Sequence, residues 1–313
     1  MRGDLLTILR CPLCRGAIEP DDFTNDMEAG TLHCLSCGET FEVERGMPSM
    51  LSDRLPGMRE KKREIAGWVE KARGEDWYEP EEEVDTSLPF VCRELGWDDP
   101  VWAANEYSFS RFLERWVRPG LKVLEIGAAK SWASQHLLPR GCEYVATDVL
   151  ADDNIGIGRG AFFAARVGHY ERVQADGEHL PFAAGSFDLA FCVATLHHAL
   201  DLPKMVSEMS RVTRRGGAVV ALNEGTRPLG WRDEAPAQEG EKSLGINEHT
   251  HTAWAYLAAF TRARVLVREL YPADGRLLGR CAGWGIVSTL GVQTVLGPKL
   301  GYGGISLAGT KLR

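Results

Sequence analysis

The sequence has no apolar run near the ~20 residues that a membrane-spanning helix needs, although 44% of its 313 residues are hydrophobic. Its first residues, MRGDLLTILRCPLC, lack the long apolar stretch of a secretory signal, so none is expected. An excess of positive charge is also missing. The formal net charge of −8 disfavours a broad nucleic-acid surface, because such binding depends on neutralised phosphates. We therefore expect a cytoplasmic globular protein that contacts no membrane.

Cysteine is the residue whose placement is most informative. Four of the eight cysteines form two C-x-x-C pairs, Cys11, Cys14, Cys34 and Cys37. Each pair can present two thiolates from a tight turn, and two such turns can enclose a tetrahedral Zn²⁺ ion. Gly16 and Gly38 follow the pairs, where positive φ angles would turn backbone amides toward the sulfur atoms. A unit of ~50 residues has little core of its own, so the metal is expected to supply much of its folding free energy.

The segment from Leu5 to about Leu51, LLTILRCPLCRG…LHCLSCGETFEVERGMPSML, resembles the small zinc-ribbon family typified by the activator subunit of tRNA and protein methyltransferases. The resemblance implies a structural zinc ion, since four cysteine ligands leave no open position for a substrate. It also implies a methyltransferase partner, here fused in the same chain. We divide the chain into a zinc ribbon (1–52), a helical and acidic linker (53–104) and a larger domain (105–313).

The linker has two parts. MREKKREIAGWVEKAR has helical periodicity with its charges expected on the outer face. EDWYEPEEEVD (75–85) is an acidic run, typical of a solvated connector, although Trp77 and Tyr78 could instead cover a pocket. An amphipathic helix, WAANEYSFSRFLERWV, follows and offers Asn105 and Tyr107 as weaker contact candidates.

From residue 121 onward, strand-like and helical segments alternate. The strand-like segments are KVLEIG, EYVATDV, YERVQAD, FDLAFCVA, GAVVALNE, RARVLVRELY and GISLAGTKL. This alternation predicts an α/β fold, doubly wound around a mainly parallel seven-stranded sheet. Ligands of such sheets bind beyond the carboxyl ends of the strands, where the strand order reverses.

The polar residues at these strand ends indicate a nucleoside site. No G-x-G-x-x-G motif follows the first strand, so a close approach to a pyrophosphate is not provided. Asp148 closes the second strand at the spacing from Gly127 where a carboxylate meets ribose hydroxyls. Asp176 closes the third strand. Carboxylates fit a cationic nucleoside better than a polyphosphate.

Four segments, VLEIGAAKS, ATDV, ADGEHLPFAAGSFDLAFCVATLHH and EMSRVTRRGGAVVALNE, resemble class I S-adenosylmethionine-dependent methyltransferases over about 105–313. The resemblance implies S-adenosylmethionine as the cofactor. It places Glu125 and Gly127 at the methionine end, Asp148 at the ribose, Asp176 and Gly177 beside the adenine, and Ala194 beneath the methyl group.

Ala129 and Ser131 depart from the family, which prefers glycine at the first position and often at the second. A Cβ atom disfavours positive φ by ~1 kcal/mol where that conformation is needed. Alanine and serine are mild replacements, so we expect a working cofactor loop that includes both residues, with a vestigial loop as the alternative.

Histidines mark the acceptor side. GINEHTHTAWAYLAAF follows a polar insert (225–245) and clusters Asn247, Glu248, His249 and His251. This cluster could bind the acceptor, supply a general base, hold a metal ion or simply cap a helix. TLHHALD adds His197 and His198 after the fourth strand. The catalytic candidates are His249, His251 and His198.

The leading interpretation is a methyltransferase of a small-molecule acceptor of natural-product or saccharide type. The alternatives are an RNA methyltransferase whose ribbon grips nucleic acid, which the net charge disfavours, and a non-catalytic cofactor-binding scaffold. The apolar segment 276–304 could be a substrate wall, an oligomer contact or ordinary packing. The sequence leaves the oligomeric state open.

Overall fold

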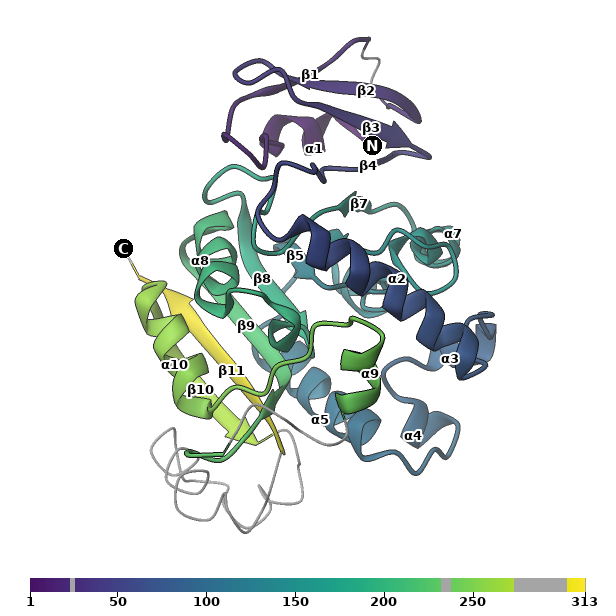
Figure 1. Ribbon diagram of the computed structural model, residues 1–313, viewed down its shortest axis with the longest axis vertical. Helices are drawn as coiled ribbons and strands as arrows, with labels where there is room; N and C mark the ends of the chain where they lie inside the picture. The colour runs from purple at the N-terminus through teal and green to yellow at the C-terminus, as the bar shows by residue number, and fades with distance from the viewer. Residues whose placement is uncertain (23–25, 232–237, 273–302, 313) are drawn as a thin grey trace.

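The computed structural model describes residues 1–22, 26–231, 238–272 and 303–312, which form a small unit above a larger one (Figure 1). The small unit contains a four-stranded sheet and the larger one a seven-stranded sheet. Of the apolar segment 276–304, only its last two residues lie within the described part, at the start of β11 (Gly303–Lys311). Within these residues, no helix combines the length and apolar character needed to cross a bilayer.

The small unit is an antiparallel ribbon around the four N-terminal cysteines. Helix α1 (Gly3–Ile8) precedes strands β1 (Ile18–Pro20), β2 (Ala29–Cys34), β3 (Thr40–Glu44) and β4 (Met47–Pro48), which pair in that order. Gly38 has the expected positive φ of 73°, but at the first cysteine pair the positive φ of 65° belongs to Arg15 instead of Gly16. Glycine is still required at position 16, since a Cβ atom there would lie 2.5 Å from Ser36 Oγ.

The seven-stranded sheet organises the larger unit, with the strand order β10-β11-β9-β8-β5-β6-β7. Its other strands are β5 (Lys122–Ile126), β6 (Glu143–Asp148), β7 (Glu171–Gln174), β8 (Phe187–Val193), β9 (Thr213–Thr226) and β10 (Val265–Pro272). Strands β5 to β9 pair in parallel, whereas β11 runs antiparallel to β9 and β10. The predicted doubly wound, mainly parallel sheet is confirmed, and its order reverses between β5 and β8.

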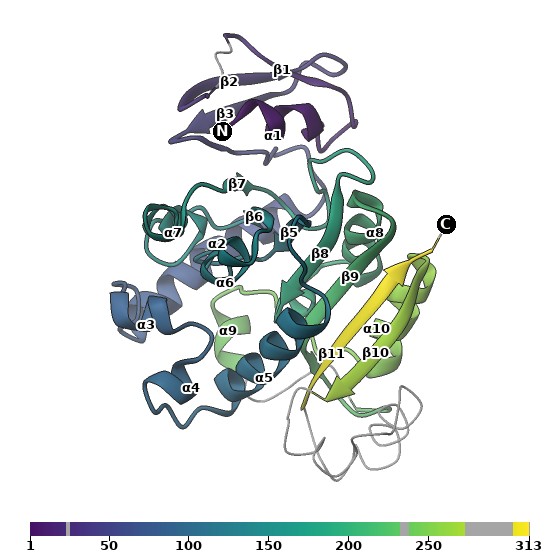
Figure 2. The same ribbon diagram turned by 180° about the vertical axis from the view of Figure 1, so that it is seen from behind.

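Helices cover both faces of this sheet (Figures 1 and 2). One face carries α8 (Leu202–Val212) and α10 (Ala253–Arg262), and the other carries α5 (Pro100–Arg115), α6 (Ser134–Leu137) and α7 (Gly160–Val167). Helix α5 is the predicted amphipathic helix. Leu124 and Ile126 of β5 join the core under α8, while Val123 joins the core under α5. A central strand buried on both faces explains why its sequence is continuously apolar around one acidic residue.

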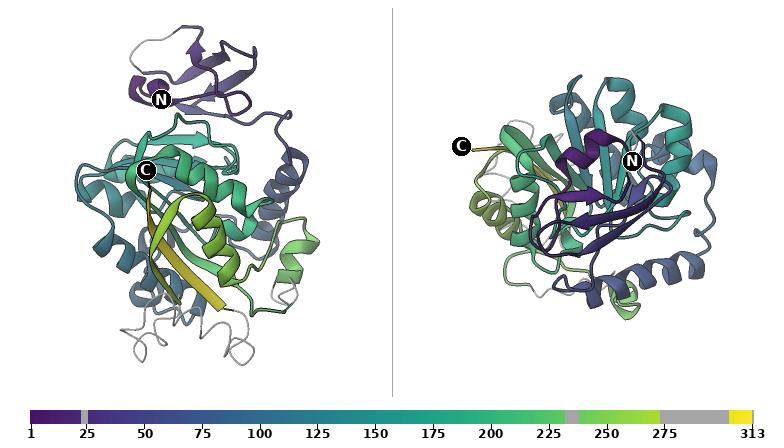
Figure 3. Two further views of the ribbon diagram at one scale, coloured as in Figure 1. Left: turned by 90° about the vertical axis from the view of Figure 1, so that its left-hand side faces the viewer. Right: turned by 90° about the horizontal axis from the view of Figure 1, so that it is seen from above.

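The ribbon packs directly on the larger unit, against the side that carries β7 (Figures 1 and 3). Arg10 N–H donates to the Pro181 carbonyl at 2.9 Å, and Met50 N–H donates to the Gln174 carbonyl of β7 at 2.8 Å. Arg15 forms an ion pair with Glu208 of α8 at 2.6 Å. Apolar residues of both units belong to one core cluster. The ribbon is therefore held by backbone pairing, charge and apolar contact together.

Helix α2 (Met58–Gly74) crosses the larger unit, and the short helices α3 (Glu82–Ser87) and α4 (Val91–Glu94) follow it, with α9 (Glu239–Ser243) nearby (Figure 1). The expectation that the charges of α2 all face outward is wrong for two of them. Lys61 is 6% exposed and Glu64 is 3% exposed. Periodicity did not reveal this, because these side chains are buried against charged and polar partners instead of an apolar face.

The acidic run is exposed at six of its seven acidic residues, as expected of a solvated connector, but its last acidic residue differs. Asp85 is fully buried, and its carboxylate contacts Lys130 Nζ and Arg159 Nε, each at 2.8 Å. Tyr78 donates a hydrogen bond to Asp152 at 3.0 Å. The end of the acidic run is thus a structural support for the loop that follows β5, which contains Lys130.

We predict that Asp85→Asn lowers the free energy of unfolding by about 3 kcal/mol, because removing one partner leaves buried charge uncompensated. Asp153→Asn is the matched control, since its ion pair with Arg45 has side chains 58% and 64% exposed. An exposed pair contributes at most about 1 kcal/mol. Urea unfolding of both variants measures the difference, and equal losses would contradict the assigned role of Asp85.

Candidate functional site

The loop after β5 has a backbone conformation that usually requires glycine. Positive φ angles occur at Gly127 (68°), Ala129 (43°) and Ser131 (64°). The two positions at which glycine was expected therefore adopt the glycine conformation without being glycine. Such residues are strained by ~1–2 kcal/mol each, and strain of this kind gathers at functional sites.

Asp148, at the carboxyl end of β6, holds this loop. Its Oδ2 accepts the Ala129 N–H at 2.8 Å, and its Oδ1 accepts the Leu150 N–H at 2.9 Å. Burial raises the pKa of Asp148, although these backbone donors oppose the rise. Each carboxylate oxygen has a second lone pair, so Asp148 can support the loop and still accept hydrogen bonds from a ligand.

Two of the predicted cofactor residues, Glu125 and Ser131, are buried beneath the loop that follows β5. Glu125 is 1% exposed, and its Oε2 accepts the hydroxyl hydrogen of Tyr144. Ser131 is fully buried, and its N–H donates to the Ala128 carbonyl at 2.7 Å. Gly127, in contrast, is partly exposed, and a Cβ atom there would lie 2.3 Å from Thr195 Cγ2. The loop after β5 is thus closely packed against the loop after β8.

The third strand end carries Asp176 and Gly177. Asp176 is 2% exposed and contacts His179 Nδ1 at 2.7 Å while accepting the Glu178 N–H at 3.0 Å. Gly177 packs closely, because a Cβ atom there would lie 2.6 Å from Met205 Cε. Ala194, with a φ of 48°, follows β8 at the same edge of the sheet. The predicted cofactor residues therefore share one edge of the sheet.

A second cluster lies where β8 and β9 end. Glu224 is fully buried, and its carboxylate accepts the backbone N–H groups of Thr195 and Leu196, both at 3.1 Å. His197 Nδ1 lies 3.0 Å from Glu224 Oε2. Burial lowers the pKa of His197, but the hydrogen bond and charge of Glu224 outweigh it, so the net direction is upward. Glu224 was not among the residues predicted from the sequence, where it is only the last residue of the strand-like segment GAVVALNE.

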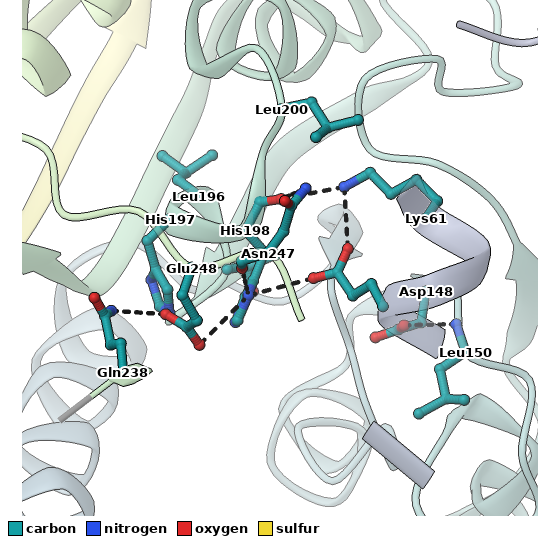
Figure 4. A network of polar contacts seen from close by, with 12 residues as sticks. Lys61, Asp148, Leu150, Leu196, His197, His198, Leu200, Gln238, Asn247 and Glu248 are labelled. Carbon is teal, nitrogen blue, oxygen red and sulfur yellow. Dashed lines mark hydrogen bonds and ion pairs between the residues drawn. The ribbon is translucent and has the colours of Figure 1, made fainter. Parts of the chain in front are cut away.

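His198 belongs to the same network, which Figure 4 shows. Its Nδ1 lies 2.6 Å from the Asn247 carbonyl oxygen, while Lys61 Nζ donates to the His198 carbonyl at 3.2 Å. Burial and the neighbouring His197 lower the pKa of His198 well below its usual range. Glu64 lies 3.4 Å from His198 Nδ1, and burial raises the pKa of Glu64 to about 7. Helix α2 thus contributes two charged residues that sequence analysis placed in solvent.

The NEH segment meets this network from the other side. Glu248 Oε2 lies 3.9 Å from His197 Nε2 and accepts Gln238 Nε2–H at 2.7 Å. His249 N–H donates to the His197 carbonyl at 3.0 Å. The rings of His249 and His251 are 5.9 Å apart. The structure therefore brings together the two histidine motifs that the sequence presented separately.

Of the weaker candidates, Asn105 and Tyr107 make contacts within the protein. Asn105 Oδ1 accepts Asn223 Nδ2–H at 2.7 Å. The Tyr107 ring packs edge-on against Tyr271 at 6.2 Å.

The four N-terminal cysteines converge as the spacing predicted. Cys11 Sγ lies 3.6 Å from Cys37 Sγ, and Cys14 Sγ lies 3.4 Å from Cys34 Sγ. All four sulfur atoms are within 4.8 Å of one another. Zinc–sulfur bonds of ~2.3 Å place the sulfur atoms of a tetrahedral site about 3.8 Å apart. The cysteine geometry therefore fits a closed, four-thiolate metal site.

We predict a specific pH dependence from Glu125. Burial raises the pKa of Glu125 to about 8 from 4.5, with the Tyr144 hydrogen bond opposing and the Asp148 charge reinforcing the rise. The folded protein then binds more protons than the unfolded chain between these values, so the stability contributed by Glu125 is lost as the pH rises through this window.

Glu125→Gln removes this loss. The difference in unfolding free energy between the variant and the parent is expected to change in favour of the variant as the pH rises from 4.5 to 8. The change is about 1.4 kcal/mol per pH unit, or several kcal/mol over the whole range. Glu114→Gln, on the exposed side of α5, is the control. Denaturant unfolding across the pH range gives the comparison, and parallel curves for the parent and Glu125→Gln would refute it.

Comparisons with known proteins agree with this geometry. Residues 124–221 match the methyltransferase domain family, and residues 3–46 match the Trm112p-like protein family. The demethylmenaquinone methyltransferase of Mycobacterium sp. (strain JLS) is 33% identical over 110 residues, which cover 35% of this chain and 44% of that protein. The biotin biosynthesis bifunctional protein BioHC of Cellvibrio japonicus is 30% identical over 174 residues, which cover 48% of this chain and 32% of that protein. The chain spans less than half the length of these curated relatives.

Solved structures show the same fold. The geranyl diphosphate C-methyltransferase of Streptomyces coelicolor A3(2) aligns with a TM-score of 0.57 at 14% identity, covering 84% of this chain and 100% of that one. The [4+2]-cyclase SpnF aligns with a TM-score of 0.51 at 16% identity, and the alignment covers 73% of this chain and 94% of that one. Residues 124–221 thus match a methyltransferase domain and lie in a class I methyltransferase fold, and residues 3–46, which precede them, match a Trm112p-like domain.

Proposed function

We propose that this protein transfers a methyl group from S-adenosylmethionine to a small-molecule acceptor. The observation that carries the proposal is the edge formed by the loops after β5 and β6. There, a strained loop with three positive φ angles is tied to Asp148, which retains acceptor capacity. The methyltransferase family match spans this edge.

The residues of this edge suit the cofactor in charge and in exposure. Ala129 is exposed and Asp148 is partly exposed, so both can meet a nucleoside, with Asp148 accepting the ribose hydroxyls. The acidic strand ends suit a cationic sulfonium. Gly127 and Ala194 would flank the methionine end, Asp176 and Gly177 the adenine end, and the buried Glu125 and Ser131 would position the loop from below. S-adenosylmethionine, when bound, supplies the electrophilic methyl group.

A small acceptor is supported by the setting of the second cluster. A hollow of about 420 Å³ between α2 and the 245–249 segment is lined by Glu248 and His249, among others. This volume falls in the range of small-molecule pockets. Relatives with methyltransferase names include a demethylmenaquinone methyltransferase and a sterol 24-C-methyltransferase.

We further propose that the cysteine cluster of the ribbon holds a structural zinc ion. Its sulfur separations fit tetrahedral thiolate coordination, and four thiolates leave no open position. The zinc would stabilise the ribbon, which in turn packs on β7 and α8.

Asp148→Asn is predicted to weaken S-adenosylmethionine binding at least tenfold, because hydrogen bonds to a charged group contribute ~1.5–3 kcal/mol each. Asparagine keeps the size and one acceptor oxygen, so the loop retains a support. Asp153→Asn, on the exposed ion pair with Arg45, serves as the control. Titration calorimetry measures both, and affinity of Asp148→Asn within twofold of the parent would contradict the ribose role.

His249→Ala is predicted to lower turnover by ~10²–10⁴-fold with little change in cofactor affinity, if His249 takes the acceptor proton. Its contact with His197 uses the backbone N–H, which alanine keeps. His169→Ala, at a 39% exposed side chain, is the control. Unchanged turnover in His249→Ala would transfer the role to His251 or His198.

The test of the function as a whole is transfer of a labelled methyl group from S-adenosylmethionine. The purified protein is offered a small-molecule extract and total RNA in parallel. Label in the small-molecule fraction supports the proposal, and label in RNA alone would replace it with RNA methylation. Label in neither fraction, together with no cofactor binding by calorimetry, would indicate a non-catalytic protein with a vestigial cofactor loop.

A further inference from the structure

Helix α2 reaches across the edge of the sheet where the predicted cofactor residues gather. At its start, Gly57 packs against Leu200 of the segment after β8, because a Cβ atom on Gly57 would lie 2.4 Å from Leu200 Cδ1. Toward its end, Ala72 forms an apolar cluster with Leu150 and Ile155, which follow β6. Strand β5 lies between β8 and β6 in the sheet. The helix therefore passes from the segment after β8 to the segment after β6.

Glu64 is buried in the middle of this span. Its Oε1 lies 3.4 Å from His198 Nδ1, in the segment after β8, and its Oε2 lies 3.5 Å from Lys61 Nζ. Burial raises the pKa of Glu64 to about 7, and the charge of Asp148 adds to the rise, so the two carboxylates lie near each other. Glu64 is thus placed between the segment that follows β8 and the end of β6.

The sulfonium of a bound cofactor belongs in the same interval. In the proposed function, on which this step rests, Asp148 holds the ribose, while Gly127 and Ala194 flank the methionine end. The sulfur atom joins these two parts of the cofactor. Gly127 packs against Thr195, directly after Ala194, so the methionine end would lie against the segment after β8. The positive sulfur atom would then lie near Glu64.

The buried charges in this region favour a cation. Burial alone would lower the pKa of Lys61, but the charges of Glu64, Asp176 and Glu178 raise it. Lys61 Nζ lies 3.7 Å from Glu178 Oε1. One ammonium group balances only one of these carboxylates when all three are ionised. A positive charge on a ligand is therefore favoured here, and Glu64 contributes to that preference from the helix side.

We propose that Glu64 makes the cofactor site distinguish S-adenosylmethionine from its product, S-adenosylhomocysteine. In methyl transfer the acceptor forms a bond to the methyl carbon, the electron pair of the carbon–sulfur bond stays on sulfur, and the acceptor proton is released. The sulfonium cation thus becomes a neutral thioether. A carboxylate nearby attracts the first and not the second. Glu64 is then a specificity-determining residue that favours exchange of the product for fresh cofactor.

Titration calorimetry of the full chain with each of the two ligands at pH 8 tests this. The quantity compared is the ratio of the two affinities. Unit charges ~10 Å apart at an effective dielectric constant of 20 change a binding constant about tenfold. We therefore expect Glu64→Gln to lower the ratio about tenfold and to keep the affinity for S-adenosylhomocysteine within about twofold. Glu64→Asp retains the charge and is expected to restore most of the ratio. Glu70→Gln, exposed on the same helix, is the control.

The same ratio measured at pH 6 gives a readout that a purely structural role would not change. Glu64 is mostly protonated at pH 6 and mostly ionised at pH 8, so the ratio of the parent is expected to rise several-fold between them. Glu64→Gln loses this rise. The charged and titratable groups that surround Glu64 are Lys61, Asp148, Glu178, His198 and Glu248. They are present in both chains, so the difference between the chains reports Glu64.

The outcomes separate this inference from the proposed function. Binding of both ligands with the same ratio in the parent and in Glu64→Gln overturns the inference and leaves the proposed function in place. A parent that binds neither ligand contradicts the proposed function and the inference with it. If Glu64→Gln fails to bind S-adenosylhomocysteine, the pH dependence of the parent decides, and a ratio that is equal at pH 6 and pH 8 overturns the inference.

Discussion

The strained loop after β5 is the constraint on which the rest of the site depends. Alternate residues Gly127, Ala129 and Ser131 are left-handed, and two of them carry a Cβ atom that opposes this conformation. The loop persists because its surroundings hold it. Asp148 accepts the Ala129 N–H, and Asp85 anchors Lys130 from beneath. The conformation of the loop is thus held by residues at the end of β6 and in helix α3, without a ligand. A preorganised binding site requires this.

The parts of the fold that sequence analysis predicted are those encoded by local patterns. Apolar runs such as those of β5 and β8 fit a sheet buried on both faces, and the alternation with helices specifies parallel pairing. The cysteine pairs converge as expected from their C-x-x-C spacing, which is a local pattern typical of zinc ligands. The acidic strand ends, such as Asp148, were found because a strand end is a local feature whose place in a parallel sheet is known.

The parts that were missed depend on partners far away in the sequence. Lys61, Glu64 and Asp85 stand in charged stretches, and charge in a single sequence indicates a solvated surface. Their burial follows from contacts with His198, Lys130 and Arg159, which no local pattern relates to them. The meeting of His197 with Glu248 is of the same kind, since the folded sheet creates it. Buried ion pairs are therefore the features that single-sequence reasoning finds least well.

The contact between the ribbon and β7 also covers one edge of the seven-stranded sheet. Strand β7 is the last strand of the seven-stranded sheet, and Ser49 pairs with Gln174 on its open side. Met50 N–H satisfies the Gln174 carbonyl there. An unprotected edge strand is a template for pairing with other chains. The ribbon thus covers the edge of β7. A chain whose ribbon failed to fold would expose this strand edge and the apolar residues beneath the ribbon, and we expect such chains to self-associate.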